Sequence, residues 1–304
     1  MDSKLIDVLK THLKFTDNQI EQINSNKDFY LYRNHPNLMY NLLINYSFLL
    51  EKKLTTISDE DKALSITIDD AKESVKNAIT HNPLIMYYSS QELEKKWDNL
   101  TKVVIPDNEN LNNPFVLSSK MVTDLVLAEA NILNTDYIKI NIQLERIAKF
   151  GYTKKQLINI VKNNPTTLVT PIDDLKKRFY SMTEYKYSKN DVLRFTSRIP
   201  DLLTYPDERV ENRFLILNAI GLHDAPIKSP YILRFSSHTT YARYCYFIDN
   251  NIEINMENYN DLFACEKDFS KKYGVSSNRL TKIYKFKQFE HEKEKIFINR
   301  EKKS

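Results

Sequence analysis

The sequence is poor in glycine. Its 304 residues include only three, Gly151, Gly221 and Gly274, whereas globular proteins average about 7%. Loops that wrap the phosphates of a nucleotide depend on glycine, because their backbone approaches the ligand closely and takes up positive φ angles. Neither GxGxxG nor GxxxxGK[ST] occurs, so the common dinucleotide- and ATP-binding loops are excluded. The composition suits helices joined by short turns.

Cysteine and histidine are also scarce. Cys245 and Cys265 are well separated in the sequence and form no CxxC motif, which argues against a disulfide framework or a zinc site. We expect two buried free thiols, as in a reducing compartment. The six histidines are scattered, none has the spacing of a metal site, and no acid completes a triad with His238 and Cys245. The sequence predicts no metal, no cofactor and no enzymatic activity; a nuclease-like carboxylate cluster is the enzymatic alternative.

Long apolar runs are absent as well. No run reaches the roughly 18 residues of a membrane helix, so no membrane partner is expected. The N-terminus, Met1-Asp-Ser-Lys, has neither the apolar core of a signal peptide nor the arginines of a transit peptide. We therefore expect a protein that works where it is made, or one whose presequence has been removed.

Charge is present but unevenly distributed. Residues 1–140 hold 15 Lys and Arg against 20 Asp and Glu, a balance of −5, whereas residues 141–304 hold 29 against 20, a balance of +9. Ten of the eleven arginines, all except Arg33, lie in the second part. This asymmetry predicts that the second part faces a polyanion. The plain alternative is a solvated helical surface with a basic tail.

A repeat organises the chain. The pattern P-x-x-[LM]-x9-[RK]-[aromatic]-x2-[apolar] occurs four times, beginning at Pro83, Pro165, Pro200 and Pro230. The basic residue 13 positions after the proline is Lys96, Arg178, Arg213 or Arg243. The spacing of the last three prolines is typical of a helical-repeat array, in which the period is roughly 30–35 residues.

Capping signals place the helices of each repeat. Two capping boxes, in which a hydroxyl side chain precedes its reciprocal partner by three residues, are Thr153 with Gln156 and Ser188 with Asp191. They predict first helices over Lys154–Asn163 and Lys189–Arg198, each stopped by the repeat proline. A second helix should open six residues after that proline, at Pro171, Pro206, Ser89 or Ser236.

Such a repeat cannot bury its apolar face alone, so neighbouring repeats must stack. We therefore predict an all-α fold of right-angle helix-turn-helix repeats, about 30–35 residues long, stacked into a curved α-solenoid over residues 1–289. Within it, 1–140 would form weaker acidic repeats, around Pro36 and Pro114, and 141–289 basic repeats with a closing helix at Ser276–Lys285. Asp107–Asn113 should be a surface loop, and 290–304 a charged tail. Whether residues 1–80 continue the solenoid or form a separate cap stays open.

Three segments carry a resemblance to a known family: NNPTTLVTPIDDLKKRF, RIPDLLTYPDERVENRFLILNAIGL and SPYILRFSSHTTYARYCYFIDNN. They look like the mitochondrial transcription termination factor family, best over residues 150–250, and the N-terminal LKFTDNQIEQI resembles the opening helix of insect members. The resemblance implies a left-handed superhelix that binds double-stranded DNA along a basic concave face. It also implies a place in the mitochondrial matrix and a role in stopping or tuning transcription. Some members of the family bind ribosomal RNA instead.

The first candidates for DNA contact are cations beside the proline turns. Arg194 and Arg198 lie four residues apart at the end of a first helix, and therefore on one face. Lys162 holds a similar place in the preceding repeat, and Arg234 follows the next turn. Lysine and arginine neutralise phosphates, and arginine also reads guanine. The alternative is that these are ordinary exposed cations near helix C-termini.

The repeated cations Arg178, Arg213 and Arg243 have two interpretations. They either contact nucleic acid or hold the fold together, by pairing with acids such as Asp174 or Glu211 or by bonding turn carbonyls. Further nucleic-acid candidates are Arg209, Lys189 and Arg279. Phe195, Tyr152, Tyr185 and Tyr187 could stack on an unpaired base, but core packing or anchoring of a turn is the expected role.

The favoured function is a sequence-selective double-stranded DNA-binding protein of mitochondria that binds as a monomer and blocks or pauses the polymerase. Two alternatives remain. One is an RNA-binding factor in mitochondrial ribosome assembly. The other is a helical scaffold that binds proteins on its concave surface.

Overall fold

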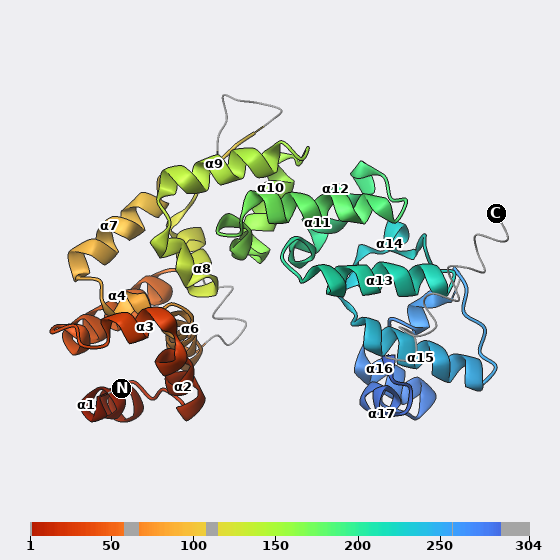
Figure 1. Cartoon of the computed structure of the whole chain (residues 1–304), viewed down its shortest axis with the longest axis horizontal. Helices are drawn as coiled ribbons and strands as arrows, with labels where there is room; N and C mark the ends of the chain where they lie inside the picture. Colours follow the sequence, from red (N-terminus) through yellow and green to blue (C-terminus); the bar gives the residue numbers. More distant parts are fainter. Residues whose placement is uncertain (1, 58–66, 108–114, 257, 287–304) are drawn as a thin grey trace. The chain divides into compact units, whose positions relative to one another are not determined.

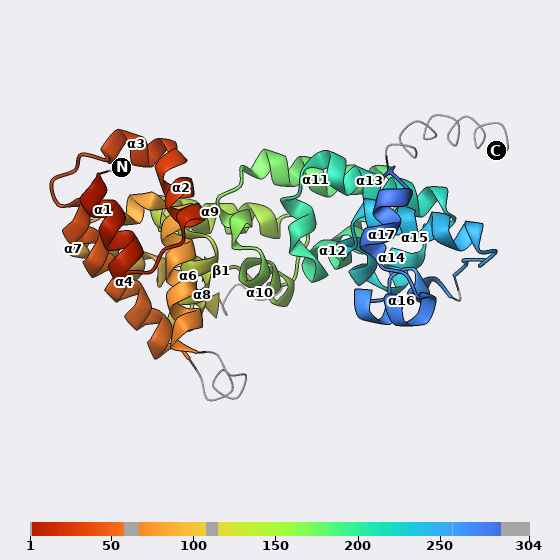
Figure 2. The same cartoon turned by 90° about the horizontal axis from the view of Figure 1, so that it is seen from below.

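The computed structural model describes residues 2–57, 67–107, 115–256 and 258–286. The chain separates into two compact units (Figures 1 and 2), unit 1 being Met1–Ile172 and unit 2 Asp173–Ser304. Within the described residues of both units, no helix is long and apolar enough to cross a membrane.

Unit 1 consists of short helices and turns that follow one another closely along the chain (Figure 1). Its elements are α1 (Ser3–Asp7), η1 (Val8–His12, a π-helical turn), α2 (Asp17–Ser25), α3 (Lys27–Tyr32), α4 (Leu38–Thr55), α6 (Ile68–His81), η2 (Pro83–Met86), α7 (Ser90–Leu100), β1 (Val104–Ile105), β2 (Phe115–Val116), α8 (Ser119–Ala128), η3 (Ala130–Asn134), α9 (Tyr137–Ala148), α10 (Lys154–Asn163) and η4 (Pro165–Leu168).

Unit 2 repeats the same alternation of helix and 3-10 turn. Its elements are α11 (Ile172–Glu184), α12 (Lys189–Arg198), η5 (Pro200–Leu203), α13 (Asp207–Ala219), α14 (Ala225–Lys228), η6 (Pro230–Arg234), α15 (Ser237–Asp249), η7 (Tyr259–Asp261), α16 (Glu266–Tyr273) and α17 (Ser277–Ile283). The all-α, helical-repeat fold predicted from the sequence is confirmed.

The predicted helix boundaries agree closely with those observed. α10 and α12 span the expected residues, and both capping boxes are formed. The repeat prolines each begin a one-turn 3-10 helix. This position suits proline, because N–H groups in the first turn of a helix have no acceptor within the helix and the missing N–H costs nothing there. Pro171 and Pro206 differ slightly from expectation, because each lies just before its helix, and the second helices begin one residue later, at Ile172 and Asp207.

One complete repeat of unit 1 escaped the sequence pattern. α8, η3 and α9 form the same helix-turn-helix as the others, but Ala130 stands where the other repeats have proline. The weaker repeat expected here was placed around Pro114, which lies outside the described residues. Two short antiparallel strands, β1 and β2, pair Val104 with Val116 just before this repeat. They are a local exception to the predicted all-α fold.

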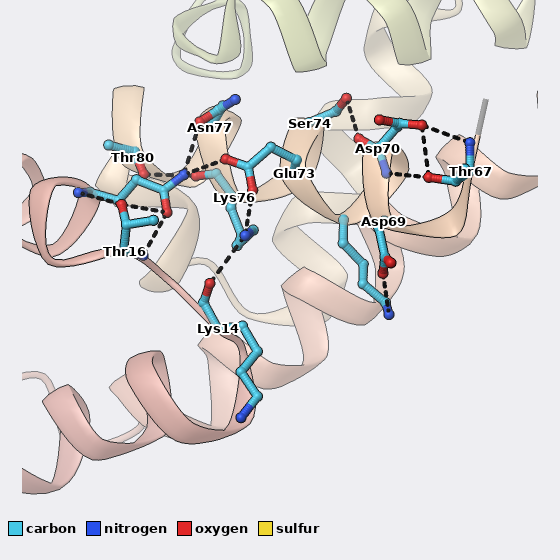
Figure 3. Close-up of polar contacts among 12 residues, drawn as sticks. Lys14, Thr16, Thr67, Asp69, Asp70, Glu73, Ser74, Lys76, Asn77 and Thr80 are labelled. Atoms are coloured by element: carbon cyan, nitrogen blue, oxygen red, sulfur yellow. Dashed lines mark hydrogen bonds and ion pairs between the residues drawn. The ribbon is translucent and has the colours of Figure 1, made fainter. Parts of the chain in front are cut away.

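The N-terminal helices belong to unit 1 and are fastened to α6 by polar side chains (Figure 3). Gln19 of α2 donates to Glu73 at 2.9 Å and to Asn77 at 3.0 Å. Lys76, which is almost buried, forms an ion pair with Glu73 and donates to the carbonyl oxygen of Lys14 at 3.1 Å. These bonds satisfy the buried lysine. They join residues within 1–80 to one another, and these residues belong to unit 1.

Unit 2 has an aromatic-rich core. Phe195, Phe214 and Phe247 are fully buried, and Tyr187 packs edge-on against Phe195 with ring centroids 5.1 Å apart. The Tyr187 ring also stacks on His223 at 4.5 Å. Tyr187 is almost completely buried, and burial raises its pKa. These rings are core residues, as expected, and are not free to stack on a base.

Candidate nucleic-acid interface

The cation 13 positions after the repeat proline joins one repeat to the next. Lys96 donates to the carbonyl of Leu133 at 2.8 Å, and Arg178 donates to that of Leu203 at 3.1 Å. Both acceptors lie in the 3-10 turn of the following repeat. We call side chains that make this bond fastening residues. A carbonyl at the end of a short turn lacks a helical partner, so a donor from the neighbouring repeat stabilises it.

The same bond recurs where the sequence pattern is degenerate. In the repeat that begins at Ala130, the equivalent position is Gln143, whose amide donates to the carbonyls of Thr167 and Thr170 at 3.1 and 2.7 Å. In α4, Asn45 donates to the carbonyls of Ile85 and Tyr88. The sequence pattern specifies a basic residue at this position and therefore misses both. The required property is a donor that reaches a turn carbonyl, which an amide also provides.

Arg243 is the most completely bonded fastening residue. Its side chain is 2% exposed and donates to the carbonyls of Leu262 at 2.9 Å and Ala264 at 2.7 Å, to the Ser277 hydroxyl at 2.9 Å and to Glu266 at 3.2 Å. Burial lowers the pKa of the guanidinium, but arginine stays charged in proteins. Its donors are therefore already used by the protein.

Arg213 occupies the same repeat position with fewer partners. It is 2% exposed, its Nε donates to the carbonyl of Phe235 at 3.2 Å, and its Nη1 and Nη2 atoms have no hydrogen-bond partner among the described residues. The guanidinium faces the ring of Tyr205 at 4.6 Å, and exposed Arg209 covers the same ring at 4.0 Å. Arg213 is thus buried and poorly placed to reach a ligand, whereas Arg209 is open to solvent.

The structural role predicted for these arginines included carbonyl bonds and acidic partners. The carbonyl bonds are present. The acids are Asp207 for Arg178, at 3.1 Å, and Glu266 for Arg243, rather than Asp174 or Glu211. Hydrogen bonds from Lys177, first, and from Arg178 hold the pKa of Asp207 below its ordinary value.

A second group of cations is free of such bonds and lies on elements that touch. α12 packs its Val192 and Phe195 side chains inward, as does its C-cap Ile199, which leaves Arg198 exposed and Arg194 half-exposed. α12 contacts η6, where Arg234 is exposed with its guanidinium 5.3 Å from the Tyr231 ring centroid.

None of these three arginines forms an ion pair within the part of the chain that the structure describes. Lys189, in the first turn of α12, is also exposed and unpaired there. These four side chains are the predicted candidates that unit 2 brings onto neighbouring elements. They can donate to phosphate without breaking a bond of the fold.

The structure adds one residue to this group. Lys228 ends α14, two positions before Pro230, and Arg198 ends α12 two positions before Pro200. Lys228 is exposed, so adjacent repeats carry an exposed cation at an equivalent helix end. The sequence does contain a signal for Lys228, because it lies two positions before its repeat proline, as Arg198 does.

The remaining candidates are scattered. Lys162 is exposed near the end of α10 in unit 1, and Arg279 is exposed in α17 of unit 2. No observation tests either residue, and both stay predictions.

The scarce reactive residues do not gather into a chemical site. No group of three His, Cys, Asp or Glu side chains within the described residues could hold a metal ion. Both cysteines are free, but the expectation that they are buried was wrong. Cys265 is exposed at the N-cap of α16, where its thiol donates to Asp268 at 3.1 Å, and Cys245 is only half-buried. The ring of His238 packs on Phe286 at 4.7 Å.

Comparison with known families now accounts for the repeat. The family model described as mTERF matches residues 35–260, about three quarters of the chain and every repeat from α4 to η7. The chain belongs to the mTERF family. mTERF proteins are nucleic-acid-binding factors of organellar gene expression, and the helical repeats described above are mTERF repeats. A search of curated proteins finds no match.

Proposed function

We propose that this mTERF protein binds double-stranded DNA in mitochondria and regulates transcription there by blocking or pausing the polymerase. The observation that supports this most directly is the division of its cations. The fastening residues donate to turn carbonyls within the fold, whereas Arg194, Arg198, Lys228 and Arg234 remain accessible to solvent on α12, α14 and η6. Accessible, unpaired cations are what a phosphate backbone requires.

Arginine at these positions favours duplex DNA with some base recognition. A guanidinium can bond two acceptors of a guanine in the major groove, whereas a lysine supplies only a point charge. Each chain carries the whole group of cations in unit 2, so one copy suffices for one binding site. Lys162, Lys189, Arg209 and Arg279 would add contacts to the backbone, each contributing to the salt dependence of binding.

The proposal is tested by binding the full chain to its mitochondrial genome, tiled as short duplexes, at two salt concentrations with ribosomal RNA fragments as competitors. We expect tight binding to a few duplexes and a steep fall of affinity with salt. A preference for the RNA fragments would favour a role in ribosome assembly. Absence of binding to either nucleic acid would contradict the proposal and leave the protein-binding scaffold.

A further inference from the structure

Helix α4 has an apolar side that nothing in the described structure covers. From Leu38 to Leu50 the helix contains no charged residue, so it is apolar nearly all round, which is typical of a helix buried on every side. Yet Tyr40 is 68% exposed and Leu43 42% exposed. Of the fourteen large exposed apolar residues in the described part of the chain, four lie on α4 and two on the preceding α3.

The exposed side is also hollowed. A shallow groove of about 500 Å³ runs along it and is lined by Tyr40, Leu43, Ile44, Ser47, Phe48 and Glu51. Phe48 forms one wall, held edge-on against Trp97 of α7 at 5.5 Å. The groove follows three turns of one helix, which is the footprint of another helix lying alongside.

The two ends of α4 are electrostatically complementary to each other. At its N-terminus the N-cap Asn37 makes no side-chain capping bond, and the first turn contains no acidic residue. The N–H of Leu38 donates to the carbonyl of His35 at 3.1 Å, and the next N–H groups of that turn carry an uncompensated partial positive charge. At the other end of the groove stands Glu51, exposed and without an ion pair among the described residues. A second α4 in antiparallel orientation would place each Glu51 beside the other copy's bare N-terminus.

We propose that two copies of this protein associate through the exposed side of α4, in an antiparallel helix pair with two-fold symmetry. In this orientation Tyr40 and Leu43 pack against Phe48 and Ile44 of the other copy. Such an interface is self-complementary, as two-fold symmetry demands. It replaces the monomer expected from the sequence and is independent of the nucleic-acid-binding proposal, because α12, α14 and η6 take no part in it.

The first test is sedimentation equilibrium of the full chain from about 1 µM to about 1 mM, the range in which a small interface becomes populated. The average mass should rise from 35.9 kDa towards twice that value. Leu43→Asp should weaken association by at least about tenfold, because it places a charge in the desolvated contact. The matched control is Ile142→Asp on α9, since Ile142 is also 42% exposed; it should associate like the wild type.

A charge exchange tests the orientation. Asn37→Asp should cap α4 and stabilise the single chain, but it should weaken the dimer by about threefold or more because it repels Glu51 of the other copy. Adding Glu51→Lys to that variant should restore association. A mass of 35.9 kDa at every concentration, equal effects of Leu43→Asp and Ile142→Asp, or no effect of Asn37→Asp would each overturn the proposal.

Discussion

Replacing Arg243 and Arg213 by methionine should have very different effects on stability, although the two arginines share a repeat position and are both almost fully buried. Methionine fills similar space without the charge. At position 243 it removes four hydrogen bonds and leaves the carbonyls of Leu262 and Ala264 without their donor. At position 213 it removes one bond, to Phe235, and two buried NH2 groups whose nitrogens had no partner.

The magnitudes follow from these contacts. An unsatisfied buried carbonyl costs about 1–3 kcal/mol, and breaking a buried charge pair costs about 3–5 kcal/mol. Glu266 is 53% exposed and can regain water, so Arg243→Met should lower the free energy of unfolding by about 3 kcal/mol. For Arg213→Met, loss of the bond to Phe235 is unfavourable, whereas removal of the buried guanidinium relieves its desolvation cost. These two effects oppose each other, and the free energy of unfolding should change by no more than about 1 kcal/mol.

Hydrogen exchange followed by mass spectrometry measures this difference where it arises. Amides of α15 and α17, which pack together, should lose roughly a hundredfold protection in Arg243→Met, since about 1.4 kcal/mol corresponds to tenfold. In Arg213→Met the loss in α13 and η6 should stay below roughly tenfold. Equal losses in the two variants would refute the claim that the number of satisfied turn carbonyls sets the contribution of a fastening residue.

Three further outcomes are expected. Gln143→Leu should destabilise unit 1 by about 2 kcal/mol in urea denaturation, because it leaves the Thr167 and Thr170 carbonyls unpaired; a change below about 0.5 kcal/mol would show that the amide does not fasten the repeats. Ser188→Ala should cost about 1 kcal/mol through loss of its capping box, with full recovery in Ser188→Thr.

Stability should also fall in acid through Glu266. Burial alone would raise the pKa of this carboxyl, but hydrogen bonds from Ser277, Ser270 and Arg243 outweigh it and the pKa is lowered from 4.5. A carboxyl whose pKa is lower in the folded than in the unfolded state stabilises the fold at a pH above its unfolded pKa. This contribution is lost as the pH falls through the folded pKa. In a pH series of urea midpoints, Glu266→Gln should flatten the decline below pH 4.5; an unchanged slope would contradict this.

The sequence predicted the repeats because their local signals are strong. A hydroxyl residue three positions before a reciprocal partner, followed by a proline where the helix should end, leaves the backbone few alternatives. α10 and α12 were therefore located to the residue. The repeat at Ala130 was missed because alanine, unlike proline, occurs in helices and turns alike and therefore does not mark the first position of a 3-10 turn. The strand pair of Val104 and Val116 depends on pairing across a connection, which no local pattern encodes.

The site was less predictable than the fold. Whether a cation faces solvent or a turn carbonyl depends on the neighbouring repeat, so Arg178 and Arg198 look alike in sequence although one is bonded within the fold and the other exposed. Gln143 was overlooked because it carries no charge, although its amide can donate to the turn carbonyl as the basic residues do. The exposed side of α4 was invisible for a similar reason: an apolar helix predicts burial, and only the structure shows that one side is uncovered.

The accessible cations around α12 should bind nucleic acid, whereas the fastening residues should not. The most direct test compares Arg194→Gln/Arg198→Gln with the control Lys95→Gln/Lys139→Gln, which removes two exposed charges from α7 and α9. Affinity for the tightest-binding duplex should be measured over a salt series. The arginine variant should bind more weakly and lose about two units of the slope of log affinity against log salt, and the control should keep the wild-type slope. Equal slopes in the two variants would contradict the account.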